Sequence, residues 1–200
     1  MRYSLCPSSA NWSSDRTMFR WFAERSARRE AAEKIYDSIV AQSRNPVFYV
    51  RCGVPDTLSG RFDMLVIHMF IVMQNLKLGA NEGKLLGKEI IEAFVREMDS
   101  MVRDLGIADI YVAQEVRKIA DLFYRQLVVY TNAVEQKNKA ALAEAIWKSF
   151  QSGDENANVA ADELANYIFQ AIKNIGEMPL NLLLQGHLNF PEVYGLKQAV

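Results

Sequence analysis

The side chains that could do chemistry in this sequence are few and scattered. The two histidines, His68 and His187, and the two cysteines, Cys6 and Cys52, lie far apart, and the sequence contains no C-x-x-C or H-E-x-x-H pattern. It also contains no G-x-S-x-G elbow, and neither cysteine has a histidine base nearby in sequence. A metal site at His68 would need further ligands, which the spacing does not supply. We therefore expect no catalytic residue, no metal and no cofactor.

Charge and composition narrow the class of protein. The 200 residues carry a formal net charge of −1 and half of them are hydrophobic, which suits one folded domain with a core. Nucleic-acid-binding domains are usually basic, so that class is disfavoured. The longest apolar run, Met64–Met73, is far shorter than the roughly 20 residues that a bilayer crossing requires. The N-terminus lacks a secretory signal pattern, so we expect a cytoplasmic protein.

Two lines of polar residues run through the most apolar segment. Arg61, His68 and Asn75 are spaced seven apart, so they stack along one side of a helix, while Asp63 lies on roughly the opposite side. Because a buried charge must be paired, we expect partners for Arg61 and Asp63 on neighbouring helices. Two interpretations stay open: the polar line faces a groove that binds another protein, or it is structural polarity satisfied inside a bundle.

The helix that carries these residues is expected over about 57–78. Apolar side chains surround almost its whole circumference, which is typical of a buried central helix. Asp56 or Thr57 can cap its first free amides. Gly60 in its first turn costs roughly 1 kcal/mol against alanine, which indicates close packing against another backbone. The methionines of this helix and the next form either plain core or an adaptable binding surface; they are Met64, Met69, Met73, Met98 and Met101.

The whole sequence predicts an all-α fold, a single-domain antiparallel bundle of about six to seven helices around this central helix. We expect the folded domain over 18–193, a disordered extension over 1–17 and a flexible tail over 194–200. Periodicity and Gly or Pro stops place the other helices over about 18–43, 82–105, 109–136, 137–150 and 159–175, with a short one after Pro179.

Several shorter segments carry expectations of their own. Val47 to Val50 are interpreted as a strand fragment or an extended linker, and Asp109 as the cap of the helix that follows it. The apolar residues of that helix, from Tyr111 through Leu122 and Phe123 to Tyr130, follow helical spacing and are expected core. The apolar stretch from Leu180 to Pro191 is expected to dock on the bundle or to form part of a partner surface.

A basic and aromatic segment near the N-terminus suggests a membrane contact. Phe19, Arg20, Trp21 and Phe22 stand among further arginines, and a basic helix with exposed aromatics is the pattern of an interfacial anchor. The alternative is a helix end that its aromatics hold against the bundle, with solvated arginines.

Three stretches of the sequence carry a family resemblance. The first, residues 55–68, reads PDTLSGRFDMLVIH; the second is Val112–Tyr124; the third is the stretch from Leu180 to Pro191. Together, over about 18–193, they resemble the ubiquinol–cytochrome c chaperone family. The sequence departs from the family pattern where Tyr124 is followed directly by Arg125, since a glycine is expected between them.

The resemblance implies a helical assembly chaperone for the cytochrome bc1 complex, without catalytic residues. Mitochondrial members bind newly made cytochrome b, together with a small partner protein, near the ribosome exit and the inner membrane. The sequence looks like a bacterial relative, cytoplasmic or peripheral on the inner membrane. The central helix and its neighbours would frame a groove for an apolar cytochrome b segment. Candidate residues that bind this client or shape the groove are Asp56, Thr57, Gly60, Arg61, Asp63, Met64, His68 and Tyr124.

Two other classes of function stay open. One is an enzyme that acts on a lipid-like or quinone-type substrate in an apolar helical cavity, which a deep closed pocket with perturbed carboxylates would favour. The other is a plain helical scaffold that recruits partners. An open groove lined by methionines would favour the chaperone.

Overall fold

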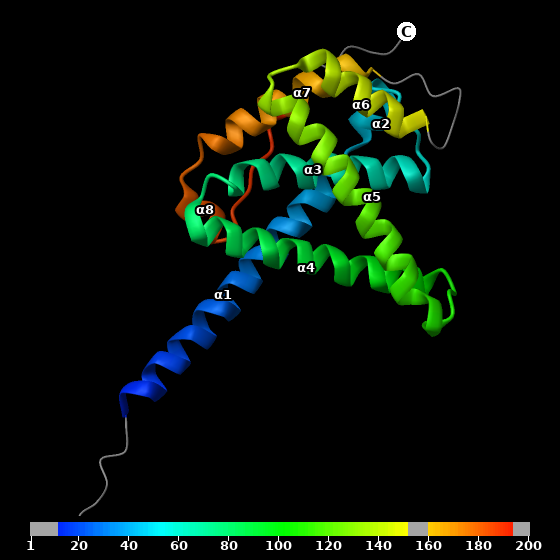
Figure 1. Ribbon diagram of the computed structural model, residues 1–200. Helices are drawn as coiled ribbons and strands as arrows, with labels where there is room; N and C mark the ends of the chain where they lie inside the picture. The colour runs from blue at the N-terminus through cyan, green and yellow to red at the C-terminus, as the bar shows by residue number, and fades with distance from the viewer. Residues whose placement is uncertain (1–11, 152–159, 194–200) are drawn as a thin grey trace, which may run out of the picture.

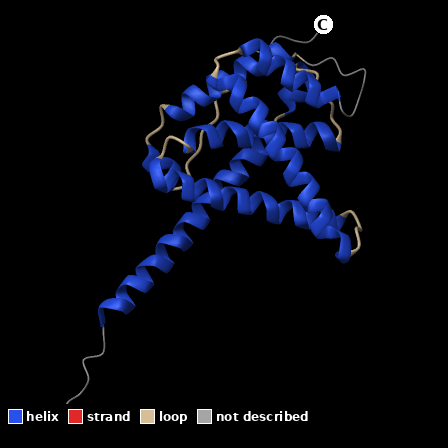
Figure 2. Cartoon of the chain, in the orientation of Figure 1, coloured by secondary structure: helices blue, strands red, loops and turns tan. Residues whose placement is uncertain are grey.

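The computed structural model describes residues 12–151 and 160–193, and over these ranges the chain consists of helices and their connections (Figure 1, Figure 2). This confirms the predicted all-α bundle. Residues 1–11 and 194–200, within the expected extension and tail, lie outside the described residues, as does most of the polar loop at 152–159. The helices are α1 (Trp12–Ser43), α2 (Pro46–Arg51), α3 (Leu58–Leu76), α4 (Ala80–Asp104), α5 (Asp109–Glu135), α6 (Lys139–Gln151), α7 (Ala161–Gly176) and α8 (Leu180–Leu184).

Helix α3 lies at the centre of the bundle, as its all-round apolar sequence predicts (Figure 1). It contacts α1, α4, α5, α6 and α7, and most of its side chains are buried. The Thr57 hydroxyl accepts a hydrogen bond from the Gly60 amide at 3.1 Å, which caps the first turn. The helix therefore starts at Leu58 and ends at Leu76, slightly inside the expected bounds.

Gly60 is held against the backbone that leads into α3. A Cβ atom at this position would overlap the carbonyl oxygen of Pro55. No side chain can relieve that overlap, because the obstacle is main chain. The predicted close approach of two backbones is confirmed.

Helix α1 is longer than the sequence predicts. It begins at Trp12, so residues 12–17 are helical rather than part of an extension. Residues 12–43 contain no glycine or proline, and nothing in them interrupts the helix. Its C-terminal half buries Ala31, Ile35 and Ile39 in the core, whereas its N-terminal half projects away from the other helices (Figure 1).

The prediction for residues 47–50 is wrong, because this stretch belongs to a short helix, α2. The Asn45 side chain accepts a hydrogen bond from the Val47 amide at 3.1 Å, and Pro46 occupies the first helical position. Asparagine as a cap followed by proline is a helix start. This local signal outweighs the β-branched and aromatic composition, and Phe48 becomes fully buried.

Of the two helix ends at the turn between α4 and α5, one agrees with expectation and the other does not. Gly106 has a φ of +79° and follows the end of α4, as the glycine stop there predicts. Asp109 does not cap α5: the cap position is Ala108, without a side-chain hydrogen bond. The Asp109 carboxylate instead bonds Arg103 of α4 at 2.6 Å.

The C-terminal segment docks on the bundle, as expected. Helix α8 contacts α1 and α4, and Leu183, Leu188 and Val193 are buried. At Gly186, where φ is +86°, an added Cβ would lie 3.1 Å from the Cα atom of Ala31. The segment is therefore part of the folded core.

Candidate functional site

A partly open groove lies between α1, the first turns of α3, and α4, and is called here the α1–α3–α4 groove. Its volume is about 280 Å³. Apolar side chains from all three helices make up most of its wall, and two of them are methionines. The lining residues are Tyr36, Val40, Ser43, Arg44, Leu58, Arg61, Phe62, Leu65, Glu97, Met98 and Met101.

Arg61 stands at the rim of the α1–α3–α4 groove. Its Nε atom lies 2.7 Å from Oδ1 of Asp56, and both side chains are more than half exposed. The expected partner on a neighbouring helix is therefore wrong for Arg61, because the loop before α3 already supplies a carboxylate. The hydrogen bond from Arg61 lowers the pKa of Asp56. Exposed pairs of this kind add little stability, which leaves the guanidinium free to exchange its partner.

Tyr36 contributes a buried hydroxyl to the wall of the same groove. Among the described residues, this hydroxyl has no hydrogen-bond partner. Burial raises the pKa of Tyr36, so the group stays protonated. An unpaired buried donor costs free energy.

Asp63 lies away from the groove, between α3 and α5. Its Oδ1 atom accepts a hydrogen bond from Gln126 at 2.7 Å, which confirms the expected partner on a neighbouring helix. Burial raises the pKa of the Asp63 carboxyl to about 6. The second carboxylate oxygen of Asp63 and the amide oxygen of Gln126 have no partner among the described residues, so the pair lacks one donor.

His68 is fully buried on a third side of α3, and both of its ring nitrogens are hydrogen-bonded. Nδ1 donates to the carbonyl oxygen of Met64 at 2.8 Å, because a carbonyl can only accept. Nε2 therefore accepts from the Tyr167 hydroxyl at 3.0 Å, and that hydroxyl accepts from Gln42 at 3.1 Å. Burial lowers the pKa of His68 to about 4, so the ring is neutral at pH 7.

The structure thus brings only part of the predicted residues to one place. Arg61 and Asp56 meet at the groove, and Thr57 and Gly60 shape the start of the helix that forms its floor. Met64 is fully buried in the core.

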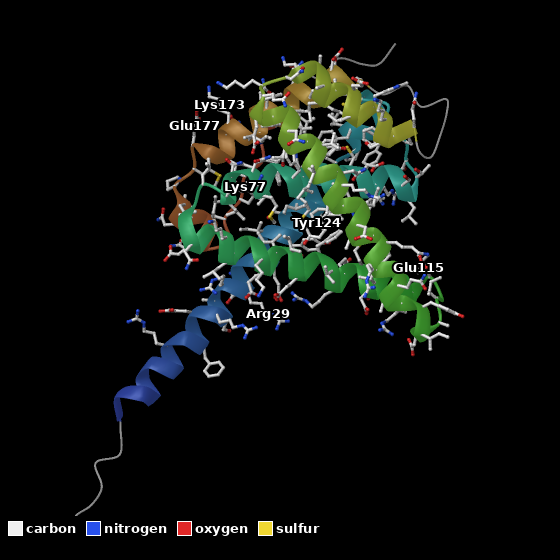
Figure 3. All side chains as sticks on the ribbon, viewed as in Figure 1. Arg29, Lys77, Glu115, Tyr124, Lys173 and Glu177 are labelled. Carbon is white, nitrogen blue, oxygen red and sulfur yellow. The ribbon has the colours of Figure 1, made fainter. Side chains whose placement is uncertain are left out.

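Tyr124 of α5 (Figure 3) is half exposed, stacks against Phe123 at 5.4 Å between ring centroids, and does not line the groove.

Sequence reasoning missed most of the groove. Phe62 and Leu65 belong to the apolar circumference of the helix expected over 57–78, whereas Tyr36 and Met98 lie on other helices. No local pattern reveals them, because the groove exists only where three helices cross. Tyr167, the partner of His68, was missed for the same reason, since it lies 99 residues away in sequence.

The candidate membrane contact is described only in part. The side chains of Phe19 and Trp21 lie outside the described residues. Arg20 is exposed and bonds Glu24 at 2.9 Å, and Phe22 is exposed beside α4. Over the described ranges, none of the helices combines the length and the apolarity that a bilayer crossing demands.

Metal and thiol chemistry find little support in the described part of the chain. Within residues 12–151 and 160–193, no three His, Cys, Asp or Glu side chains gather as metal ligands would. Cys52 is buried, and burial raises the pKa of its thiol to about 12. A thiol with such a pKa is a poor nucleophile at neutral pH.

Comparison with known proteins finds a matching family model and several relatives. The family model described as "Ubiquinol-cytochrome C chaperone" matches residues 50–190. Relatives named ubiquinol–cytochrome c reductase complex assembly factor 1 are 22% identical over 119 residues in Xenopus laevis and 22% identical over 161 residues in Homo sapiens. The two alignments cover 60% and 80% of this chain, but only 59% and 54% of the relatives, so the chain spans little more than half of their length.

A solved structure shares the fold. The crystal structure of the Cbp3 homolog from Brucella abortus is similar at a TM-score of 0.78 and 28% sequence identity, and the match covers 90% of this chain and 99% of that one. The family match includes all of α3 and the entire C-terminal docking segment up to Phe190. The chain belongs to the ubiquinol–cytochrome c chaperone family.

Proposed function

We propose that the protein is an assembly chaperone of the cytochrome bc1 complex and that it holds an apolar segment of newly made cytochrome b in the α1–α3–α4 groove. Membership of the family and the names of the relatives support the assembly role. The proposed place of action is the inner-membrane surface, where cytochrome b is inserted. A small partner protein or a ribosome, as with mitochondrial members, belongs to the same proposal.

The observation that carries the binding step is the chemistry of the groove. Its wall is mainly apolar, and Met98 and Met101 line it, two side chains that adapt to varied apolar shapes. A volume of about 280 Å³ accommodates the side chains on one face of a helix, which is the geometry of helix-in-groove binding.

The alternative of an enzyme for a lipid-like or quinone-type substrate finds less support. Such an enzyme needs an enclosed cavity with a perturbed acid or base. The groove is partly open, and its carboxylate, Glu97, is exposed. The carboxyl group with a raised pKa, Asp63, lies elsewhere. A plain scaffold would bind its partners without using the groove, so groove variants separate that alternative from the chaperone.

The first test is a reduced-minus-oxidised spectrum of b-type and c1 haem in membranes of a deletion strain. We expect the bc1 signals to fall while transcripts stay unchanged, and the restored gene to recover them. Unchanged bc1 haem in the deletion strain would contradict the assembly role.

A matched pair of exposed leucines tests the groove itself. Leu58 lines the groove and Leu78 stands beyond the other end of α3; both are strongly exposed, so Leu58→Asp and Leu78→Asp should both fold. We expect Leu78→Asp to restore bc1 haem in the deletion strain and Leu58→Asp to restore much less. Equal restoration would remove the groove from the proposal and favour the scaffold.

A further inference from the structure

A second apolar surface lies at the turn between α4 and α5 and is called here the α4–α5 knob. Leu105, Ile107, Ile110 and Tyr111 are 60%, 38%, 80% and 54% exposed, respectively. The turn stands at a corner of the molecule where the two helices project beyond the others (Figure 1). The spacing of Tyr111 predicts a core residue. The structure corrects this prediction, because this end of α5 extends beyond the neighbouring helices.

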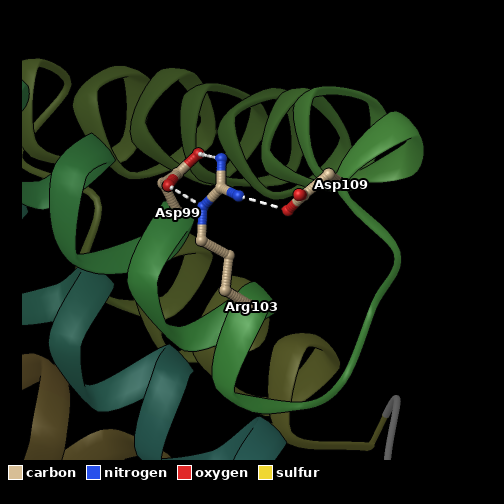
Figure 4. Close-up of polar contacts among 3 residues, drawn as sticks. All are labelled: Asp99, Arg103 and Asp109. Atoms are coloured by element: carbon tan, nitrogen blue, oxygen red, sulfur yellow. Dashed lines mark hydrogen bonds and ion pairs between the residues drawn. The ribbon is translucent and has the colours of Figure 1, made fainter.

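Charged side chains link the two helices that form the knob. Arg103 donates to Asp99 at 2.7 Å and to Asp109 at 2.6 Å, and so ties the end of α4 to the start of α5 (Figure 4). Gly106 makes the turn with a φ of +79°. An apolar surface whose turn is already ordered loses little conformational entropy when it binds.

Large apolar side chains gathered on an ordered surface mark an interaction site rather than random exposure. Among the described residues, no segment covers these four side chains, as their exposure shows. The exposed parts of these side chains add nothing to the stability of the isolated chain, whereas a binding partner could bury them.

The charge around the knob selects the kind of partner. Residues 99–111 contain three aspartates and one arginine, and that arginine is already shared between Asp99 and Asp109. Asp104 is exposed beside Leu105. The rim is therefore negative, so it repels an anionic lipid surface and attracts a cationic peptide.

The knob also continues one wall of the α1–α3–α4 groove. Met101 lines the groove, and Leu105 follows it by four residues. The two residues therefore lie on the same side of the helix, roughly 6 Å apart along its axis. An elongated ligand can therefore occupy both surfaces at once, with its apolar part in the groove and its charged part at the rim of the knob.

We propose that the α4–α5 knob binds the Lys/Arg-rich stretch that flanks a transmembrane helix of the client. Membrane proteins carry an excess of Lys and Arg in the short loops on the cytoplasmic side, so such a stretch joins positive charge to an apolar helix end. This assignment rests on the proposed function, and it gives the bound client a direction: apolar segment in the groove, positive flank at the knob.

Binding of a synthetic peptide to the purified full chain tests the assignment. The probe is a fluorescent peptide with an alanine–leucine helix followed by a lysine–arginine cluster, measured by anisotropy. Ile110→Gln and Asp104→Lys alter the apolar surface and the charged rim. Leu78→Gln and Asp37→Lys are matched controls, since Leu78 is as exposed as Ile110 and Asp37 is an exposed acid on α1.

We expect the dissociation constant to rise about fivefold or more with each knob variant and to stay within about twofold with each control. A peptide with glutamates in place of its lysines and arginines should bind about tenfold more weakly. Thermal melts should show that all four variants are folded, since all four positions are exposed.

Wild-type affinity in both knob variants, or equal binding of the glutamate peptide, would overturn the assignment. Binding to phosphatidylglycerol vesicles that is weakened only by Ile110→Gln would also overturn the assignment, because the knob would then contact lipid. These outcomes are separate from the assembly role. Loss of bc1 haem in the deletion strain would stand even if the knob bound no peptide, and unchanged haem would end the assembly role whatever the peptide does.

Discussion

At the scale of single residues, the polar side chains of α3 divide into two kinds. His68 and Asp63 are buried and bonded to other helices, so they fix how α7 and α5 sit on α3. Arg61 is exposed and bonded only within the segment that leads into the helix. The two interpretations of the polar line therefore apply to different members of it: His68 is satisfied structural polarity, and Arg61 is the member that can meet a client.

Asp63 makes the stability of the protein depend on pH. Its pKa is about 6 in the folded protein against 3.8 for the free carboxyl, so folding favours the protonated form. The contribution is fully present below pH 3.8 and is lost as pH rises through about 6. We expect Asp63→Asn to raise stability at pH 7.5 by about 2–3 kcal/mol, and the gain to vanish near pH 4. Urea unfolding at the two pH values measures it.

The same variant supplies the donor that the Asp63–Gln126 pair lacks, because an asparagine amide can donate to the free oxygen of Gln126. A gain that is equal at both pH values would show that the pKa of Asp63 is the same in the folded and the unfolded protein, and it would contradict the raised pKa.

Arg61 gives the sharpest residue test of client contact. Arg61→Ala removes an exposed ion pair, so the melting temperature should stay unchanged. Restoration of bc1 haem by this variant in the deletion strain should be weaker than with the wild type. Asp56→Asn breaks the same pair but keeps the guanidinium, and it should restore haem fully. If Arg61→Ala unfolds the protein, the residue is structural and its assignment to a client site fails.

At the scale of helices, the ends are set by a few local contacts. Thr57 caps α3, Asn45 and Pro46 begin α2, and Gly106 ends α4. The start of α3 is the most constrained of these ends, because Gly60 has no room for a side chain against Pro55.

Glycine at position 60 can be tested against a glycine that has room. Gly60→Ala forces a backbone shift, and we expect it to destabilise the protein by about 1–3 kcal/mol. Gly87→Ala is the matched control in α4: its Cβ would contact Met73 Sδ at an ordinary 3.5 Å, so it should stabilise by up to about 1 kcal/mol. Denaturant unfolding gives both values. Equal effects would mean that the backbone at Gly60 moves without cost.

Much of the structure at the scale of helices can be predicted from sequence, since it depends on residues that are close together in the chain. The apolar circumference of α3 predicts its burial, and Gly60 predicts a close backbone contact. The start of α2 also carries its signal, in Asn45 and Pro46, but the apolar composition of residues 47–50 obscures it. The hydrogen bond from Tyr167 to His68 and the exposure of Tyr111 depend on how helices cross, and no local pattern encodes that.

At the scale of the whole molecule, the C-terminal segment closes the bundle. Phe190 packs its ring against His68 at 5.2 Å between centroids, and Leu188 and Val193 are buried. The segment thereby covers the cluster in which α2, α3 and α7 meet. The protein should need this segment to keep α3 enclosed.

Truncation tests that closure. Ending the chain after Gln185 removes Leu188, Phe190 and Val193, and we expect it to cost about 4 kcal/mol or more. Ending it after Val193 keeps all three side chains and gives the reference for the thermal melt. A truncation at Gln185 that melts like the wild type would show that the docked segment contributes no stability.

Because helices that follow α3 in the chain help to enclose it, its burial is completed only late in the synthesis of the protein. The ribosome completes α3 at Leu76, but α7, which covers one of its sides, begins only at Ala161, about 85 residues later. At about 5–20 residues per second, the side of α3 that α7 covers stays open for roughly 4–17 seconds. During that interval, the protein proposed to shelter an unfinished membrane subunit itself exposes apolar helix surface, as its proposed client does.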